Sequence, residues 1–294
     1  MQKAVVVGSL HYDIFVEAPY RPQKGETVLG YKWYPKFGGK GGNQALAAAK
    51  AGLSVTMVSA VGDDHFAPAI LKVLKEHKID TSYVKTIDNA GTGMSVAIAD
   101  AEGDYGAVIV SGANRQIDNS LLDSDELFSD ASMLILQNEV SDETNLAAAQ
   151  AAKKRGVMVC INAAPAKKMP QDLAHLIDIL IVNQVEASEI SGLKVESLDE
   201  ALVCAQQLAK TMKMVVVTAG SEGVAYAVED GTCGKLKAHK VEVVSTHGAG
   251  DCFVGHLCAA LSLGKSLEEA VAFANDKAAF HVSHVQDDVL VSKD

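Results

Sequence analysis

An acidic residue beside a glycine turn is the feature of this sequence that most clearly indicates a chemical reaction. Asp251 stands at the head of an apolar run over 252–261, and the turn before it consists of Gly248, Ala249 and Gly250. The free N–H groups at a helix start, together with the helix dipole, favour a bound anion. A carboxylate beside such an anion can accept a proton from an attacking hydroxyl. The pattern predicts phosphoryl transfer with Asp251 as base, although an ordinary N-terminal cap would look the same.

A second stretch combines four glycines with one lysine and then an asparagine. It consists of Gly38, Gly39, Lys40, Gly41, Gly42 and Asn43. Glycines leave backbone amides accessible, and the lysine and asparagine side chains add further donors and an acceptor. A polyol needs many closely spaced hydrogen bonds, so we expect this stretch to bind one; a flexible glycine loop is the alternative. Asn43 is expected to start a helix that ends before Gly52.

His11 and Asp13 follow the apolar run at 4–8, which predicts a buried strand. A carboxylate at the carboxyl end of a strand is suited to bind two adjacent hydroxyls, which makes Asp13 a candidate for substrate binding. A turn aspartate would fit the same position. His11 lies in the same motif and is a second candidate for substrate contact. The run lacks the spacing G-x-G-x-x-G, which argues against a nicotinamide-dependent reductase.

Polar residues also follow three later predicted strands. Asn183 and Glu186 suit a hydrated Mg²⁺, which takes few carboxylates; the same pair would also form a helix cap. Glu139 is a further candidate at the same edge of the sheet. A glycine turn that is suited to lie along a nucleotide contains Thr218, Gly220, Ser221 and Gly223.

Composition narrows the class of protein. The chain has 294 residues, of which 48% are hydrophobic and 21% charged, as is typical of a globular protein. The net charge of -11 argues against nucleic acid or a membrane surface as a partner. Five scattered cysteines without metal-ligand spacing indicate reduced thiols and a cytoplasmic location. No apolar run reaches the ~18 residues of a membrane span.

The order of the elements predicts an α/β fold. From about residue 133, apolar strands alternate with helices, which favours a mostly parallel central sheet with helices on both faces. Strands are expected near 223–228 and 240–244, with helices at 251–263 and 267–284. The segments 12–37 and 92–110 do not fit that sheet; the latter alternates like a hairpin. We expect a single domain over 1–294, with these two segments forming a small β-sheet lid.

Taken together, these motifs resemble those of the ribokinase-like (PfkB) carbohydrate kinases. The resemblance rests on the two glycine signatures, in their order and separation, and extends over about residues 4 to 285. Asn183-x-x-Glu186 and the turn Thr218-x-Gly220-Ser221-x-Gly223 also match the family's motifs. The resemblance implies the ribokinase-like fold and an ATP-dependent sugar kinase that uses Mg²⁺.

Residue roles follow from the resemblance position by position. It implies Asp251 as the catalytic base, with the amides of 248–251 as an anion hole for the transferring phosphate. Asn275 falls where relatives commonly carry a histidine beside the adenine. The implied sugar ligands are Asp13, Gly39, Lys40, Asn43 and Glu139. The implied ligands of ATP and its Mg²⁺ are Asn183, Glu186, Thr218, Gly220, Ser221 and Gly223.

Three departures from the family pattern bear on specificity. His11 stands where the most similar members usually have an asparagine that contacts the sugar. Ser245 replaces an aspartate before the anion hole, and the segment 283–288 lacks the family's glycine-bearing loop. Those two elements build the family's monovalent-cation site, so we expect weak or absent activation by potassium.

The sequence leaves the acceptor open. Ribose or a related small sugar is the first interpretation. A nucleoside or sugar-phosphate kinase of the same family is an alternative, and a non-enzymatic sugar-binding sensor is another. The resemblance also implies a homodimer that pairs through the lid.

Overall fold

The large sheet of this chain is built from short, apolar strands. The structure is a computed structural model that describes residues 2–102, 105–284 and 290. Within these ranges, the strands of the large sheet are β1 (Lys3–Val7), β4 (Ser54–Gly62), β5 (Asp80–Ile87), β8 (Ala131–Gln137), β9 (Met158–Asn162), β10 (Ile179–Asn183), β11 (Met214–Thr218), β12 (Gly223–Val228) and β13 (Cys233–Lys237). Their order is β13-β12-β11-β10-β9-β8-β1-β4-β5. All neighbours pair in parallel except β11 with β12 and β12 with β13, which are antiparallel.

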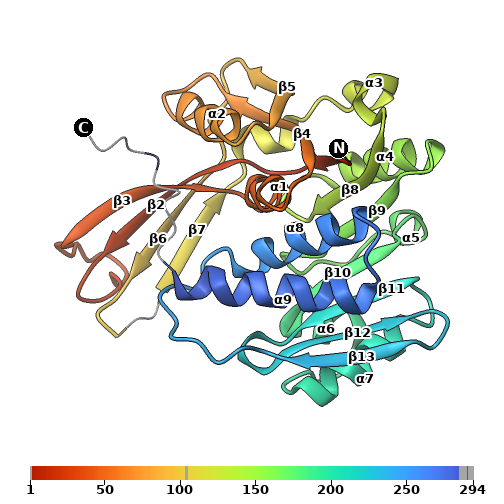
Figure 1. Ribbon diagram of the computed structural model, residues 1–294. Helices are drawn as coiled ribbons and strands as arrows, with labels where there is room; N and C mark the ends of the chain where they lie inside the picture. The colour runs from red at the N-terminus through yellow and green to blue at the C-terminus, as the bar shows by residue number, and fades with distance from the viewer. Residues whose placement is uncertain (1, 103–104, 285–289, 291–294) are drawn as a thin grey trace.

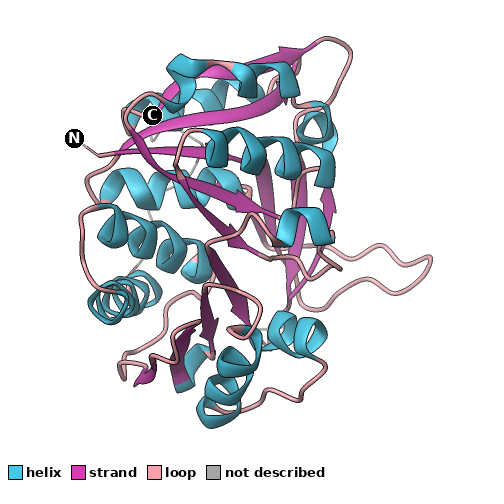
Figure 2. Ribbon diagram, turned by 90° about the vertical axis from the view of Figure 1, so that its right-hand side faces the viewer, coloured by secondary structure: helices cyan, strands magenta, loops and turns pink. Residues whose placement is uncertain are grey.

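Helices cover both faces of this sheet (Figures 1 and 2). They are α1 (Lys40–Lys50), α2 (Ala67–Glu76), α3 (Asp125–Phe128), α4 (Asp142–Lys154), α5 (Gln171–Ala174), α6 (Gln184–Ser191), α7 (Leu198–Leu208), α8 (Ala249–Ser262) and α9 (Leu267–Ser283). The side chains of β1 alternate between two cores: Val5 and Val7 pack with α3 to α7. Ala4 and Val6 pack with α1, α2, α8 and α9. The predicted α/β architecture is confirmed.

A second, smaller sheet extends from one side of the large one (Figure 1). Its strands are β2 (His11–Glu17), β3 (Lys32–Gly38), β6 (Met94–Ala99) and β7 (Tyr105–Val110), in the order β3-β2-β6-β7. These strands come from the two segments that the sequence predicts as separate from the large sheet. Alternation along β2 buries His11 and Asp13 and leaves the residues between and after them half-buried.

Some expected boundaries are wrong. Residues 240–244 form no strand; the outer strand is β13, because the chain turns back at Gly231, whose φ is 93°. The strand β5 was not expected, since it lies at the edge of the sheet and carries few buried side chains. Helix α1 begins at Lys40 rather than near Gly42, because Gly39 adopts a left-handed φ of 85° and acts as its N-cap. Among the described residues, none of the helices is long and apolar enough to span a membrane.

Candidate active site

The two glycine stretches meet where helices α1 and α8 pack together. Asn43 Nδ2 donates a hydrogen bond to Asp251 Oδ2 at 3.3 Å, although the two residues lie 208 positions apart. Gln44, the next residue of α1, donates from Nε2 to Asp251 Oδ1 at 2.9 Å. The Nε2 group of Gln44 also donates to Asn162 Oδ1 at 3.1 Å. The candidate base is therefore held by two amide side chains of the other signature.

Asp251 is the third residue of α8 and is only 7% exposed. Its helix begins after Gly248, which has a left-handed φ of 73°. Burial raises the pKa of the Asp251 carboxyl above its usual value, while the Lys40 charge and the hydrogen bonds from Gln44 and Asn43 act against the increase. A carboxylate with a raised pKa accepts protons more readily, as a general base must.

The amides of the anion-hole turn are not equivalent. The Ala249 N–H donates to the carbonyl of Thr246 at 3.2 Å, inside the turn. Gly250 is exposed, and a Cβ added there would meet no atom within 4 Å. The N–H groups of a first helical turn have no partner within the helix. An anion at this helix start can therefore come close to Gly250 and the amide that follows it.

Asp13 is a buried residue of strand β2 in the small sheet. Its Oδ1 accepts a hydrogen bond from Ser95 Oγ at 2.5 Å, across the β2–β6 pair. A Cβ added at Gly38 would overlap the Asp13 carboxylate, so a larger residue there would displace that carboxylate. His11 is 3% exposed, and its Nε2 has no hydrogen-bond partner among the described residues. A buried nitrogen of this kind is a place where a ligand hydroxyl would be stabilised.

Glu139 connects the segment after β1 with the start of α1. Its Oε2 accepts from Ser9 Oγ at 2.5 Å and from the Lys40 N–H at 2.9 Å, at the start of α1. The Lys40 charge lowers the pKa of Asp251, whereas the Glu139 charge raises it. The structure thus gathers Glu139 and Lys40 near the candidate base.

A cavity of about 960 Å³ lies on the other side of the α8 start. Asn275 lines it and donates from Nδ2 to the Lys237 carbonyl at 3.0 Å. The cavity therefore joins the glycine turn after β11 to the anion-hole turn. Its lining includes Thr218, Gly220, Ser221, Gly223, Gly250 and Asn275.

Asn183 and Glu186 are not part of that lining. Asn183 Oδ1 accepts from the Glu186 N–H at 2.9 Å, and Glu186 Oε2 accepts from the Asn183 N–H at 2.8 Å. This is the predicted helix cap, at the start of α6. Burial raises the pKa of Glu186, the Asp251 charge adds to the increase, and the Asn183 hydrogen bond and Lys40 oppose it. Within the described residues, no three His, Cys, Asp or Glu side chains gather as a metal site.

Sequence reasoning missed Gln44 and Ser95, which hold the carboxylates of Asp251 and Asp13. Gln44 stands directly after Asn43 in the glycine signature, so its position was a usable signal. Ser95 alternates with apolar residues in β6 and gave no local signal. Two departures from the family pattern were expected near the anion hole, at Ser245 and in the segment 283–288. Ser245 Oγ accepts a hydrogen bond from the His247 N–H at 3.3 Å. In the segment 283–288, positions 285–288 lie outside the described residues.

A sequence model described as "pfkB family carbohydrate kinase" matches residues 1–293. The chain therefore belongs to the pfkB family of carbohydrate kinases. The ribokinase of Bacillus subtilis (strain 168) is 35% identical over 283 residues, which are 96% of this chain and 93% of the relative. The deoxyribokinase of Salmonella typhi is 32% identical over 253 residues, or 85% of this chain and 82% of the relative. The solved structure of Arabidopsis thaliana ribokinase complexed with ribose and ATP has a TM-score of 0.88 and 31% identity, with 97% of this chain and 94% of that one covered.

Proposed function

We propose that this chain transfers the γ-phosphoryl group of ATP to a hydroxyl of ribose or a closely related pentose. The observation that carries the proposal is the Asp251 carboxylate, which Asn43 and Gln44 hold at the start of α8. It lies beside a glycine turn that suits an anion. The similarity to the plant ribokinase complexed with ribose and ATP supports the same pair of substrates here.

The pentose lies between the small sheet and the start of α1. Asp13 binds adjacent hydroxyls, and His11 Nε2, which is buried without a partner in the part of the chain that the structure describes, binds another. The remaining sugar ligands are Gly38, Gly39, Lys40, Asn43 and Glu139. In this role the small sheet acts as a lid that excludes water when the sugar is bound.

ATP occupies the cavity of about 960 Å³, a volume in the range typical of small-molecule sites. Thr218, Gly220, Ser221, Gly223 and Asn275 bind the nucleotide, and Asn183 contributes from the start of α6. The residues present also fit Mg²⁺, which keeps several waters and takes one or two carboxylates together with phosphate oxygens. Glu186 is a buried carboxylate at the start of α6, and it would hold the ion. When bound, Mg²⁺ offsets negative charge on the phosphate oxygens.

Catalysis then divides between Asp251 and the anion hole. Asp251 accepts the proton of the attacking hydroxyl as the new O–P bond forms and the bond to ADP breaks. The amides of Gly250 and Asp251, with Gly248 and Ala249 shaping the turn, stabilise charge on the phosphoryl oxygens. Because most of the acceleration in phosphoryl transfer comes from positioning, the bonds that hold Asp251 are part of the mechanism.

A coupled assay of ADP release tests the proposal. The panel of acceptors contains ribose, 2-deoxyribose, nucleosides and sugar phosphates, and we expect the highest kcat/KM with ribose or 2-deoxyribose. Activity with none of them would support the sugar-binding sensor instead, and preference for a nucleoside or sugar phosphate would support the alternative kinases.

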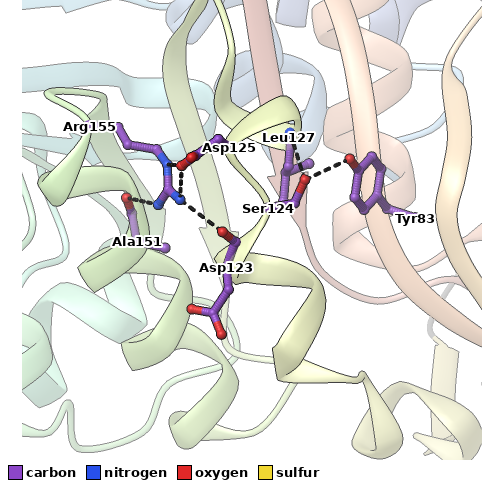
Figure 3. A network of polar contacts seen from close by, with 7 residues as sticks. All are labelled: Tyr83, Asp123, Ser124, Asp125, Leu127, Ala151 and Arg155. Atoms are coloured by element: carbon purple, nitrogen blue, oxygen red, sulfur yellow. Dashed lines mark hydrogen bonds and ion pairs between the residues drawn. The ribbon is translucent and has the colours of Figure 1, made fainter.

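The variant Asp251→Asn tests the base. Turnover should fall by a factor on the order of 10² or more, while ATP and sugar still bind in a calorimetric titration. Asp125→Asn is the matched control, because Asp125 pairs with Arg155 (Figure 3) and is not one of the proposed site residues. Near-normal turnover of Asp251→Asn would remove Asp251 from the base role.

Two further properties belong to the proposal. The chain forms a homodimer in which the small sheets of two subunits pair. The large exposed side chains of this sheet and its loops, such as Trp33 and Ile109, support such pairing. We also place the protein in the cytoplasm, in keeping with its odd, scattered cysteines.

A further inference from the structure

Asp64, in the loop between β4 and α2, joins two separate parts of the chain through its carboxylate. Oδ1 accepts hydrogen bonds from the N–H groups of Phe66 and Ala67, at 3.0 and 3.3 Å, at the start of α2. The same carboxylate also binds Thr92: Oδ2 accepts from its N–H at 2.6 Å, and Oδ1 from its hydroxyl at 2.7 Å. An ordinary helix cap needs only the first pair. The two short bonds to Thr92 therefore require another explanation.

Thr92 lies where the chain enters the small sheet, two residues before β6 begins. It is buried, and its Oγ1 accepts a further hydrogen bond from the Gly62 N–H, at the end of β4, at 2.9 Å. Gly62 is the last residue of β4, and Asp64 follows two positions later. Thr92 is therefore hydrogen-bonded to the carboxyl end of a strand of the large sheet. Hydrogen bonds to an ionised carboxylate are about twice as strong as neutral ones.

The residue after Thr92 connects this point to the other strands of the small sheet. The Gly93 carbonyl accepts from the Tyr12 N–H at 2.8 Å, in the middle of the motif that carries His11 and Asp13. A Cβ added at Gly93 would meet Asn114 and His11. The backbone at Gly93 therefore lies so close to Asn114 and His11 that a side chain would not fit at this position.

Asn114 completes the connection after β7. Its Oδ1 accepts from the Leu10 N–H at 2.9 Å, and its Nδ2 donates to the Leu10 carbonyl at 3.0 Å. Leu10 directly precedes β2. The entries into β2 and β6 and the exit from β7 therefore meet at one junction, formed by Leu10, Tyr12, Gly93 and Asn114. Its attachment to β4 runs through Thr92.

We propose that Asp64 is a positioning residue for the acceptor site, which it fixes in place through Thr92 and this junction. The inference rests on the proposed function, because it takes Asp13 as a sugar ligand. Ser95, three residues after Thr92, holds Asp13 by the 2.5 Å hydrogen bond across the sheet. Asp64 thereby sets where the Asp13 carboxylate lies relative to Asp251, while the nucleotide cavity is lined by other elements.

The ionisation of Asp64 agrees with this role. Burial alone raises the pKa of its carboxyl, but the hydrogen bonds from Thr92, Phe66 and Ala67 outweigh burial and hold the pKa below its usual value. The group is a carboxylate at neutral pH and accepts all of these bonds.

Two variants test the proposal by steady-state kinetics. Asp64→Asn replaces an acceptor with an N–H₂ group, so that one of the bonds to Thr92 is lost. Thr92→Val removes only the hydroxyl and should fold even where Asp64→Asn does not. We expect the KM for the acceptor to rise by roughly tenfold to a hundredfold in Asp64→Asn and by less in Thr92→Val, while the KM for ATP changes less than about twofold.

A second measurement does not depend on activity. Amide hydrogen exchange should accelerate at 11–13 and 93–95 in both variants and stay unchanged along α8. Thr92→Ser keeps the hydroxyl and should restore both readouts. Ser124→Ala is the matched control: Ser124 Oγ also bridges a helix start and another element, accepting from the Leu127 N–H and bonding to the Tyr83 hydroxyl (Figure 3), but neither bond involves a residue of the junction.

The outcomes distinguish the positioning role of Asp64 from the proposed kinase function. An unchanged acceptor KM in both variants, or an equal rise in the KM for ATP, would overturn the positioning role of Asp64. A wild-type chain that phosphorylates no acceptor would instead contradict the proposed function. In that case the exchange experiment still decides whether Asp64 holds the junction, since unchanged exchange at 11–13 would refute it.

Discussion

Gln44 makes the shortest side-chain hydrogen bond to the Asp251 carboxylate, so its removal should change the acidity of the base. Its Nε2 lies 2.9 Å from Asp251 Oδ1, and both residues are buried. Gln44→Leu keeps a side chain of similar size without the donor. Because the hydrogen bond favours the ionised carboxylate, its loss must raise the pKa of Asp251 further.

The size of the change follows from the bond that is lost. A hydrogen bond to a charged group contributes about 1.5–3 kcal/mol, and one pKa unit corresponds to about 1.4 kcal/mol. The pKa of Asp251 should therefore rise, and the lost bond corresponds to a displacement of the pH–rate profile by about 1–2 pH units. When the pH is lowered, a base with a higher pKa becomes protonated, and therefore inactive, at a higher pH. The acid limb of the pH–rate profile should therefore move to higher pH by the same amount.

The assay is the pH dependence of kcat with saturating pentose and ATP. Asn145→Ala is the control, because Asn145 is another fully buried amide and donates to the Gln137 carbonyl rather than to Asp251. The control should lower the melting temperature without moving the acid limb. An acid limb at the same pH in wild type and Gln44→Leu would refute the view that Gln44 tunes the base.

Two further predictions concern ions and stability. Ser245 is neutral where the family resemblance implies an aspartate, so we expect equal rates in potassium and in a bulky tetraalkylammonium salt; strong stimulation by potassium would contradict this. Asp178 binds Lys153 and Lys213 at 2.9 and 2.8 Å, and these bonds, with that from Val159, outweigh burial and lower the pKa of its carboxyl. A lowered pKa adds stability that is present above the unfolded value of about 3.9 and is lost as pH falls through the folded value. Asp178→Asn should therefore be about 1–3 kcal/mol less stable to urea at pH 7. The difference should shrink at pH 3, and a gap that is equal at both pH values would be evidence against this account.

The fold was predictable because the parallel strands carry a strong local signal. Strands such as β10 and β11 are buried on both faces and read as continuous apolar runs. The edge strand β5 gave no such signal, since it is largely exposed. The alternation of Val241 and Val243 suggested a strand, but alternation does not show whether a partner strand is present. Both side chains are exposed in a segment that pairs with no strand among the described residues.

The site was predictable to the extent that its chemistry is local. The cap formed by Asn183 and Glu186 depends on residues three positions apart, and the structure contains it. The turn before Asp251 was expected from its glycines, and Gly248 has a left-handed φ of 73° there. The roles of Gln44 and Ser95 depend on which helix or strand lies opposite, and a single sequence does not specify that. Both residues support a carboxylate that the sequence did identify.

The glycines of the first signature have a packing role that favours a rigid site over a flexible loop. A Cβ at Gly41 would lie 2.6 Å from the Ser9 amide nitrogen, and one at Gly42 would lie 2.6 Å from the Phe37 ring. On the opposite helix, a Cβ at Gly255 would lie 2.7 Å from the Ala48 nitrogen. Each distance is shorter than a real side chain tolerates, so α1 can approach α8, β3 and the segment after β1 this closely only because glycine stands at these positions. This approach brings Asn43 and Gln44 within hydrogen-bond distance of Asp251, and the signature therefore acts as much through its missing side chains as through its amides.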